Sequence, residues 1–366
     1  MNKITFLWTI LILCFTSFSF GQEREPLDSV YLSNRQLTAD EIILRVKENI
    51  STNYFVDTLN LTIKKEFIQK LNYLDFDIDN KKIKLIPKNR RAEFEKEISG
   101  FTKKTKNSRS MYSYKNTFSF QQERLKKPSV SPILKSNITS SETKIRNLPQ
   151  LINEFEAILE KYIDKEENFT IKTGIFPIER GLALDGNTMN NMEEKNQIFD
   201  EYSWPKEKII NPGIHEFLSD VEAYDYMIEK TFIYRDQLVY NIIFKPKKNR
   251  AKLTGFCIIS AENFAILKAK YDLAEGEKTW GVNFKFPLGV KVRHNIFSGE
   301  FAYKKINSGK YIPEYYHFSK GEYTYLHRNL LIKTQNGFLK RSDKLKIDLL
   351  LESQEVTTES FTFSSL

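Results

Sequence analysis

The side chains that could do chemistry in this sequence lie in a few short polar stretches, and each departs from the site it resembles. Residues 215–219, HEFLS, begin like a zinc-protease helix, in which two histidines four residues apart bind the metal. Ser219 stands where the second histidine belongs, so a metal would lack a ligand. We interpret the other histidines, which lie on strand-like segments without ligand spacing, as solvated or core side chains: His294, His317 and His327.

An acidic stretch at residues 75–80, DFDIDN, begins like a calcium-binding loop. Asn80 replaces the glycine that such a loop requires, and Ile86 replaces the glutamate that completes it. The alternation instead predicts a strand, with three carboxylates on the solvent face and Phe76 and Ile78 on the other face.

Hydrolase motifs are incomplete. Residues 141–144 (SETK) and 172–174 (KTG) match two of the three motifs of penicillin-binding enzymes, but they are too close together and no Ser-Asp-Asn lies between them. The sequence contains no nucleophile elbow, phosphate-binding glycine loop or dinucleotide fingerprint. It therefore predicts no catalytic residue, no metal site and no cofactor.

One basic cluster stands out, and it follows a strand-like segment. Its members are Lys245, Lys247, Lys248, Arg250 and Lys252. A solvated hairpin tip that protects a sheet edge is one interpretation. Contact with an anionic surface such as lipid headgroups is the other.

The segment that carries this cluster is the most regular part of the chain. Residues 226–234, 238–244, 253–260 and 264–271 alternate apolar and polar side chains and are separated by short polar breaks, which predicts a four-strand antiparallel meander. Its more apolar face holds the candidate ligand-contact residues Leu238, Tyr240, Ile242 and Phe244. Cys257 lies within the third strand and is expected to be buried and unreactive.

Helices are expected on either side of a basic segment. Thr38 and Glu41 form a capping box before an apolar stripe, which predicts a helix near residues 38–52. A second amphipathic stripe predicts a helix near 147–164. Residues 90–146 are rich in Lys, Arg, Ser and Asn, and we predict a flexible insertion there rather than core.

Further strands are expected on both sides of the meander, with hairpin turns at Asn307-Ser308-Gly309 and Lys320-Gly321. They cover residues 55–67, 73–86, 169–176, 280–286, 296–305, 311–319, 322–334, 345–351 and 360–363. The predicted fold is α+β and mainly β: a large curved antiparallel sheet, similar to a half-barrel, covered by a few helices.

The N-terminus indicates export. Lys3 precedes an apolar run, and Ser19 and Gly21 fit a peptidase cut before Gln22, so residues 1–21 read as a signal peptide; an uncleaved membrane anchor is the alternative. Residues 22–366 would then form a single domain. Without the signal peptide only Cys257 remains, so no internal disulfide can form. The expected location is the periplasm or the outer membrane, where nucleic acid is not an expected partner.

Three stretches carry a resemblance to a family of uncharacterised exported proteins from Bacteroidota: residues 39–54, 171–176 and 240–266. The strand pair in the last of these also resembles the sheet of LolA/LolB-like lipoprotein carriers. That resemblance implies a curved antiparallel sheet over helices, with an apolar cavity for acyl chains.

Three functions remain open. The leading hypothesis is a non-catalytic envelope protein that binds a lipid, a lipoprotein or another apolar envelope component, which a continuous apolar cavity would favour. An outer-membrane assembly or scaffold partner is the second, favoured by a filled core with a flat exposed patch. A hydrolase is the third, and it would need two carboxylates that face each other across a cleft.

Overall fold

The computed structural model describes residues 37–123, 129–132, 147–163, 169–173, 176–178, 212–334 and 344–365, all within the unit that spans residues 37–366. The predicted signal peptide, residues 1–21, lies outside the described residues. Within the described part, no helix is long and apolar enough to cross a membrane.

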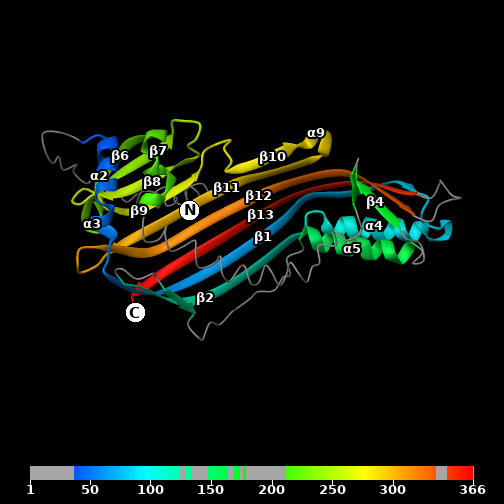
Figure 1. Cartoon of the computed structure of the whole chain (residues 1–366), viewed down its shortest axis with the longest axis horizontal. Coiled ribbons are helices and arrows are strands. Elements are labelled where there is room, and N and C mark those ends of the chain that lie inside the picture. Colours follow the sequence, from blue (N-terminus) through cyan, green and yellow to red (C-terminus); the bar gives the residue numbers. More distant parts are fainter. Residues whose placement is uncertain are drawn as a thin grey trace, which may run out of the picture. The chain divides into compact units, whose positions relative to one another are not determined.

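The described strands join one 13-stranded sheet that is curved and open. They are β1 (Thr58–Ile83), β2 (Arg109–Glu123), β3 (Ser129–Pro132), β4 (Phe169–Thr173), β5 (Phe176–Ile178), β6 (Tyr224–Tyr234), β7 (Gln237–Pro246), β8 (Leu253–Ser260), β9 (Ile266–Leu273), β10 (Trp280–Phe284), β11 (Val290–Lys305), β12 (Tyr311–Thr334) and β13 (Lys344–Ser365). The main order is β3-β2-β1-β13-β12-β11-β9-β8-β7-β6, with β10 paired to β11 and β4 to β12 (Figure 1). This confirms the predicted fold class.

Helices are few. They are α2 (Ala39–Glu48), α3 (Ile50–Tyr54), α4 (Arg91–Thr105), α5 (Leu148–Tyr162), α8 (Glu216–Ser219) and α9 (Lys285–Leu288), with short 3-10 turns η1 (Lys88–Arg90), η2 (Pro212–Ile214) and η3 (Val221–Ala223). The predicted capping box is confirmed: the Glu41 amide donates to the Thr38 hydroxyl, and the Thr38 amide donates to the Glu41 carboxylate.

The predicted insertion at residues 90–146 needs a correction. Residues 91–105 form α4, whose Phe94 and Ile98 are buried, and residues 109–123 form β2, which pairs with β1 along its length. The basic residues of α4 face solvent while its apolar residues recur at helical spacing, so the high charge concealed an amphipathic helix. The parts at 124–128 and 133–146 lie outside the described residues.

Three strands are longer than the sequence indicates: β1 has 26 residues, β12 has 24 and β13 has 22. Each was expected as two strands. The predicted turn at Lys320-Gly321 is wrong, because both residues lie inside β12 and pair with β13. At Gly321 the sheet packs too tightly for a side chain, since a Cβ would lie 2.8 Å from the Glu355 carbonyl oxygen. This glycine permits close packing rather than a turn.

The face that meets the helices has two apolar cores with a polar middle. Near one end of the long strands Leu61, Tyr316 and Phe361 join a first core with α2 and α8. Near the other end Ile78, Ile332 and Ile347 join a second core with α4 and α5. On β13 the alternation between these cores places polar residues on that same face: Ser353, Glu355, Thr357 and Glu359.

The predicted meander is confirmed as β6 to β9, joined in sequence order by antiparallel pairing. The calcium-like stretch lies in β1, as expected: Phe76 and Ile78 are buried, while Asp77 and Asp79 are exposed.

Candidate ligand pocket

The meander face that held the predicted ligand contacts is part of the first core. Ile242 and Phe244 are fully buried, and Phe217 of α8 stacks on Phe244 with ring centroids 4.3 Å apart. Leu238 and Tyr240 are partly exposed. Both side chains are enclosed in the first core, and α8 covers Phe244, so the structure gives Ile242 and Phe244 a packing role. Ligand contact at this face remains a prediction.

The predicted basic cluster is largely matched by acidic neighbours. Arg250 binds Asp220 through Nε and Nη2 at 2.5 and 2.8 Å. The remaining pairs are Lys247 with Asp225 at 3.1 Å, Lys248 with Glu222 at 3.4 Å and Lys252 with Glu277 at 2.6 Å. Lys245 is exposed. Because four of these five cations face carboxylates, the cluster resembles a paired hairpin tip more than an anion-binding surface.

The polar middle of the helix-side face begins with a buried ion pair. Lys65 of β1 is 3% exposed, and its Nζ lies 3.1 Å from a Glu359 carboxylate oxygen of β13. Its ammonium also lies within 6 Å of the ring centroids of Phe67, Tyr114 and Phe361. The charge is thus stabilised by a carboxylate and by aromatic faces, as desolvated cations require.

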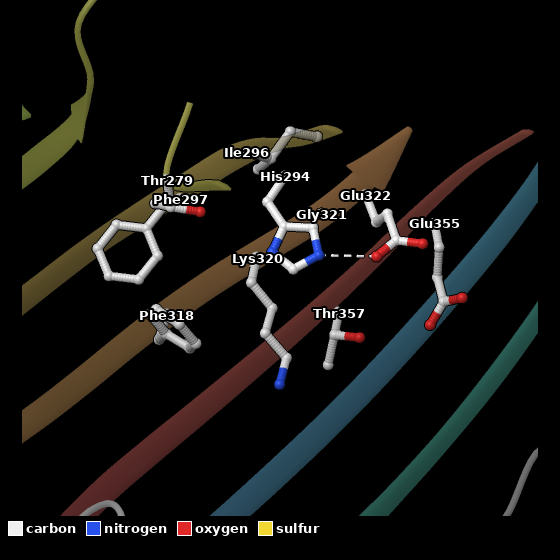
Figure 2. Close-up of a pocket in the computed structure, with 10 residues that line it drawn as sticks. All are labelled: Thr279, His294, Ile296, Phe297, Phe318, Lys320, Gly321, Glu322, Glu355 and Thr357. Atoms are coloured by element: carbon white, nitrogen blue, oxygen red, sulfur yellow. Dashed lines mark hydrogen bonds and ion pairs between the residues drawn. The ribbon is translucent and has the colours of Figure 1, made fainter. Parts of the chain in front are cut away.

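Next to this pair a pocket of about 420 Å³ opens over β11, β12 and β13 (Figure 2). Its lining residues are Thr279, His294, Ile296, Phe297, Phe318, Lys320, Gly321, Glu322, Glu355 and Thr357. The volume falls within the ~300–1,000 Å³ that is typical of small-molecule sites.

The pocket has two chemically different walls. Phe297 and Phe318 form an aromatic wall, with their rings edge to face at 5.3 Å, and continue into the first core. Across from them stand Glu322, which lies 2.7 Å from His294 Nε2, and Glu355, which accepts a hydrogen bond of 2.6 Å from the Gln69 amide. Lys320 has no ion pair among the described side chains, so its ammonium is available to a ligand.

The arrangement does not resemble a hydrolytic site. Glu322 accepts hydrogen bonds from the Thr324 hydroxyl at 3.1 Å and stands 2.7 Å from His294. In a catalytic triad the histidine lies between the carboxylate and the hydroxyl, whereas here the carboxylate lies between them, so His294 cannot take the hydroxyl proton. Glu322 and Glu355 are direct neighbours on adjacent strands, not opposed across a cleft.

Other predicted residues fall in the cores. His215, from the zinc-like stretch, precedes the four-residue α8 and stacks on Phe301 with centroids 4.5 Å apart. Cys257 is fully buried, and burial raises the pKa of its thiol. Among the described residues, no group of three or more His, Cys, Asp and Glu side chains is placed to hold a metal ion.

The sequence analysis did not predict this pocket, although one sequence pattern indicates it. Residues 318–322 place Phe318, Lys320 and Glu322 at every second position, and residues 353–359 place hydroxyl and acidic side chains at every second position. Such stretches look like breaks between strands unless the strand is known to run through them.

Comparison with known proteins identifies no family: no family model and no curated protein matches the chain. Solved structures that resemble it include a LolA superfamily protein from Nitrosomonas europaea (8% identity, 90% of this chain and 96% of that one, TM-score 0.21). Others are a DUF1329 family protein from Desulfovibrio piger (10% identity, 89% and 90%, TM-score 0.21) and the Pseudomonas aeruginosa MucA/MucB complex (7% identity, 86% and 93%, TM-score 0.22). The LolA superfamily, to which the strand pattern pointed, is thus represented among them. At TM-scores this low the likeness says nothing about what this chain binds, and the resemblance to the Bacteroidota family remains a prediction.

Proposed function

We propose that this protein is a non-catalytic envelope protein that binds an amphipathic component, such as a lipid or the acylated end of a lipoprotein, at the central pocket. The observation that carries the proposal is the pairing of an aromatic wall with a charged wall in the only polar stretch between two filled cores of the described sheet face. An apolar group would pack on Phe297 and Phe318. Its polar head would meet Lys320, Glu322 and Glu355.

The charges of the pocket define the head group more narrowly. Lys320 can donate to an anionic or carbonyl oxygen, whereas Glu322 and Glu355 can accept from an ammonium or amide. A zwitterionic or amide-bearing head satisfies both, and a purely apolar ligand satisfies neither. Each methylene removed from water on the aromatic side adds ~0.8 kcal/mol to binding.

A role as an assembly partner through strand addition has less support. The meander ends the sheet at β6, where Met227 and Ile233 are exposed. The pairing of β6 is interrupted between Ile228 and Lys230, which leaves Glu229 in a bulge on this edge strand. Bulges and charged residues are the usual means of preventing edge-to-edge pairing.

The test is native mass spectrometry of the protein purified from envelopes, together with two variants of the pocket. Phe297→Ala and Lys320→Gln should each lower ligand occupancy, the latter by about tenfold because a hydrogen bond to a charged group is lost. Matched controls are Phe256→Ala, also a half-buried phenylalanine beside the first core, and Lys64→Gln, an exposed lysine on β1. Full occupancy in both pocket variants would contradict the proposal.

A further inference from the structure

The hairpin formed by β10 and β11, with α9 at its turn, carries three exposed aromatic side chains. Trp280 and Phe284 are each 51% exposed, and Phe286, in the turn that follows, is 92% exposed. β10 pairs only with β11, so its other edge is open among the described strands. Three exposed aromatic side chains within seven residues are unusual for a surface in contact only with water.

The turn is held firmly against the sheet. Gly289 adopts a left-handed conformation with φ 63°, its amide donates to the Lys285 carbonyl, and the His327 amide donates to the Gly289 carbonyl at 2.8 Å. A Cβ at Gly289 would lie 2.0 Å from the His327 carbonyl oxygen, so only glycine fits here. The turn that carries Phe286 is thus anchored to β12 through its backbone.

Cations gather on the same hairpin. A second pocket of about 280 Å³ is lined by Gly276, Lys278, Val282, Asn283, Lys291, Val292 and Arg293. Arg293 Nη2 donates to the carbonyl oxygens of Gly276 and Glu277 at 2.6 and 3.1 Å, which fixes the guanidinium in place. Its Nε is buried without a hydrogen-bond partner among the described atoms.

The only acidic group in this stretch is already neutralised. Between Gly276 and Arg293 the sequence contains Lys278, Lys285, Lys291 and Arg293 but a single carboxylate, Glu277. Glu277 is paired with Lys252 at 2.6 Å, and the Lys252 ammonium lowers its pKa. The hairpin therefore carries a net positive charge. The register places Trp280 and Phe284 on one face of the hairpin, opposite His294 and Val290. Lys291 and Arg293, opposite Asn283 and Gly281, lie on the other face.

We propose that this hairpin docks on an anionic phospholipid bilayer through the open edge of β10. Trp280, Phe284 and Phe286 would enter the interface, and the pocket of Lys278, Lys291 and Arg293, on the other face of the hairpin, would take a headgroup phosphate. Tryptophan and phenylalanine favour the boundary between headgroups and acyl chains, and lysines near that surface are attracted to anionic lipids. A protein partner fits less well. An aromatic side chain buries ~150–250 Å², so three together bury less than the ~800 Å² that each partner buries in a stable protein interface.

The experiment is sedimentation of the full chain with phosphatidylcholine vesicles that contain or lack phosphatidylglycerol. The double variant Phe284→Ser/Phe286→Ser should reduce binding about tenfold or more, because its apolar side chains no longer leave water. Lys278→Gln/Lys291→Gln should reduce binding to phosphatidylglycerol vesicles by about fivefold for each lysine. Far-ultraviolet circular dichroism checks that each variant folds.

Matched controls remove exposed apolar side chains and lysines elsewhere. Met227→Ser/Ile233→Ser removes two side chains that are 57% and 50% exposed on β6, and Lys96→Gln/Lys103→Gln removes the same charge from α4. Both should bind as the wild type does. The inference is overturned if the wild type does not sediment, if it binds neutral vesicles equally well, or if a control loses as much as its counterpart.

Two further measurements distinguish bilayer docking from a site for free phosphate and from ligand binding in the central pocket. Glycerol phosphate in solution should not release the protein from vesicles; full release would show a site for free phosphate rather than for a bilayer. Lys320→Gln, in the central pocket, should leave vesicle binding unchanged. The two proposals therefore fail separately.

Discussion

At the scale of single residues, the buried pair of Lys65 and Glu359 is the most demanding feature of the sheet face. Neither strand can place a charge in this position without its partner, because an ion removed from water needs an opposite charge and hydrogen bonds. The sequence shows both residues, but not that they meet, since they lie on strands at opposite ends of the chain. Spacing within one segment can be read from sequence, whereas pairing between distant strands cannot.

This pair predicts a stability difference that depends on which member is removed. Glu359→Gln leaves the ammonium of Lys65 buried without its carboxylate and should lower the free energy of unfolding by about 3 kcal/mol. Lys65→Met/Glu359→Gln should recover much of that loss, because no charge is left in the sheet. Urea titration of the single and double variants measures both values. A double variant less stable than Glu359→Gln would contradict this account of the pair.

At the scale of elements, the sequence predicted most of the short elements but divided each long strand into two. The meander, α2 and α5 have apolar periodicity throughout, and each was located within a few residues. β1, β12 and β13 were divided because their middles carry polar side chains on both faces, which removes the period of two on which strand prediction rests. α4 was missed because its charged face dominates its composition.

The continuity of β12 predicts the effect of adding one methyl group. Gly321→Ala would place a Cβ 2.8 Å from the Glu355 carbonyl oxygen and 2.9 Å from Ile296 Cδ1, and it should lower stability by about 1–3 kcal/mol. Gly100→Ala is the matched control. No atom lies within 4 Å of a Cβ there, and an alanine inside α4 should raise stability by about 0.5–1 kcal/mol. Thermal unfolding of both variants compares them, and equal shifts would mean that β12 does not pack against β13 at this point.

The contact between α4 and α5 predicts a dependence on pH. Lys161 and Tyr162 of α5 both donate to the Glu97 carboxylate of α4, the latter at 2.7 Å, and lower the Glu97 pKa below its ordinary value of 4.5. The stabilisation is therefore complete above pH 4.5 and is lost as the pH falls through the lowered pKa. Glu97→Gln should cost about 0.5–1 kcal/mol at pH 7 and nothing at the acid end. Urea titration of the wild type and of Glu97→Gln, between pH 7 and pH 3, measures the difference in their free energies of unfolding. A difference that grows as the pH falls would contradict this account.

At the scale of the whole described unit, two cores share one sheet and are separated by its polar middle. A cavity in one core should therefore loosen that core first. Ile347→Ala, in the second core, should cost about 2–4 kcal/mol and speed hydrogen exchange in α4 and α5. Ile266→Ala is the counterpart in the first core, where α2 and α8 should respond instead. Equal acceleration in all helices by either variant would show a single cooperative unit.

The fold class could be predicted from the sequence, but the position of the proposed ligand site could not. Apolar alternation predicted a large antiparallel sheet, and this is confirmed. The same alternation pointed to Ile242 and Phe244 as ligand contacts, although a residue that is apolar in sequence is more often core than cavity. Both are enclosed in the first core, and only the folded chain shows that the open position lies at the polar middle.

The central claim is that ligand lies in the central pocket rather than against the meander, and photo-crosslinking tests it most directly. A photoreactive phenylalanine analogue is placed at Phe297 in one variant and at Tyr240 in another, and each protein is irradiated in intact envelopes. The account predicts a lipid-sized mass adduct on the protein labelled at residue 297 and none on the protein labelled at 240. An adduct at residue 240 with none at 297 would contradict it.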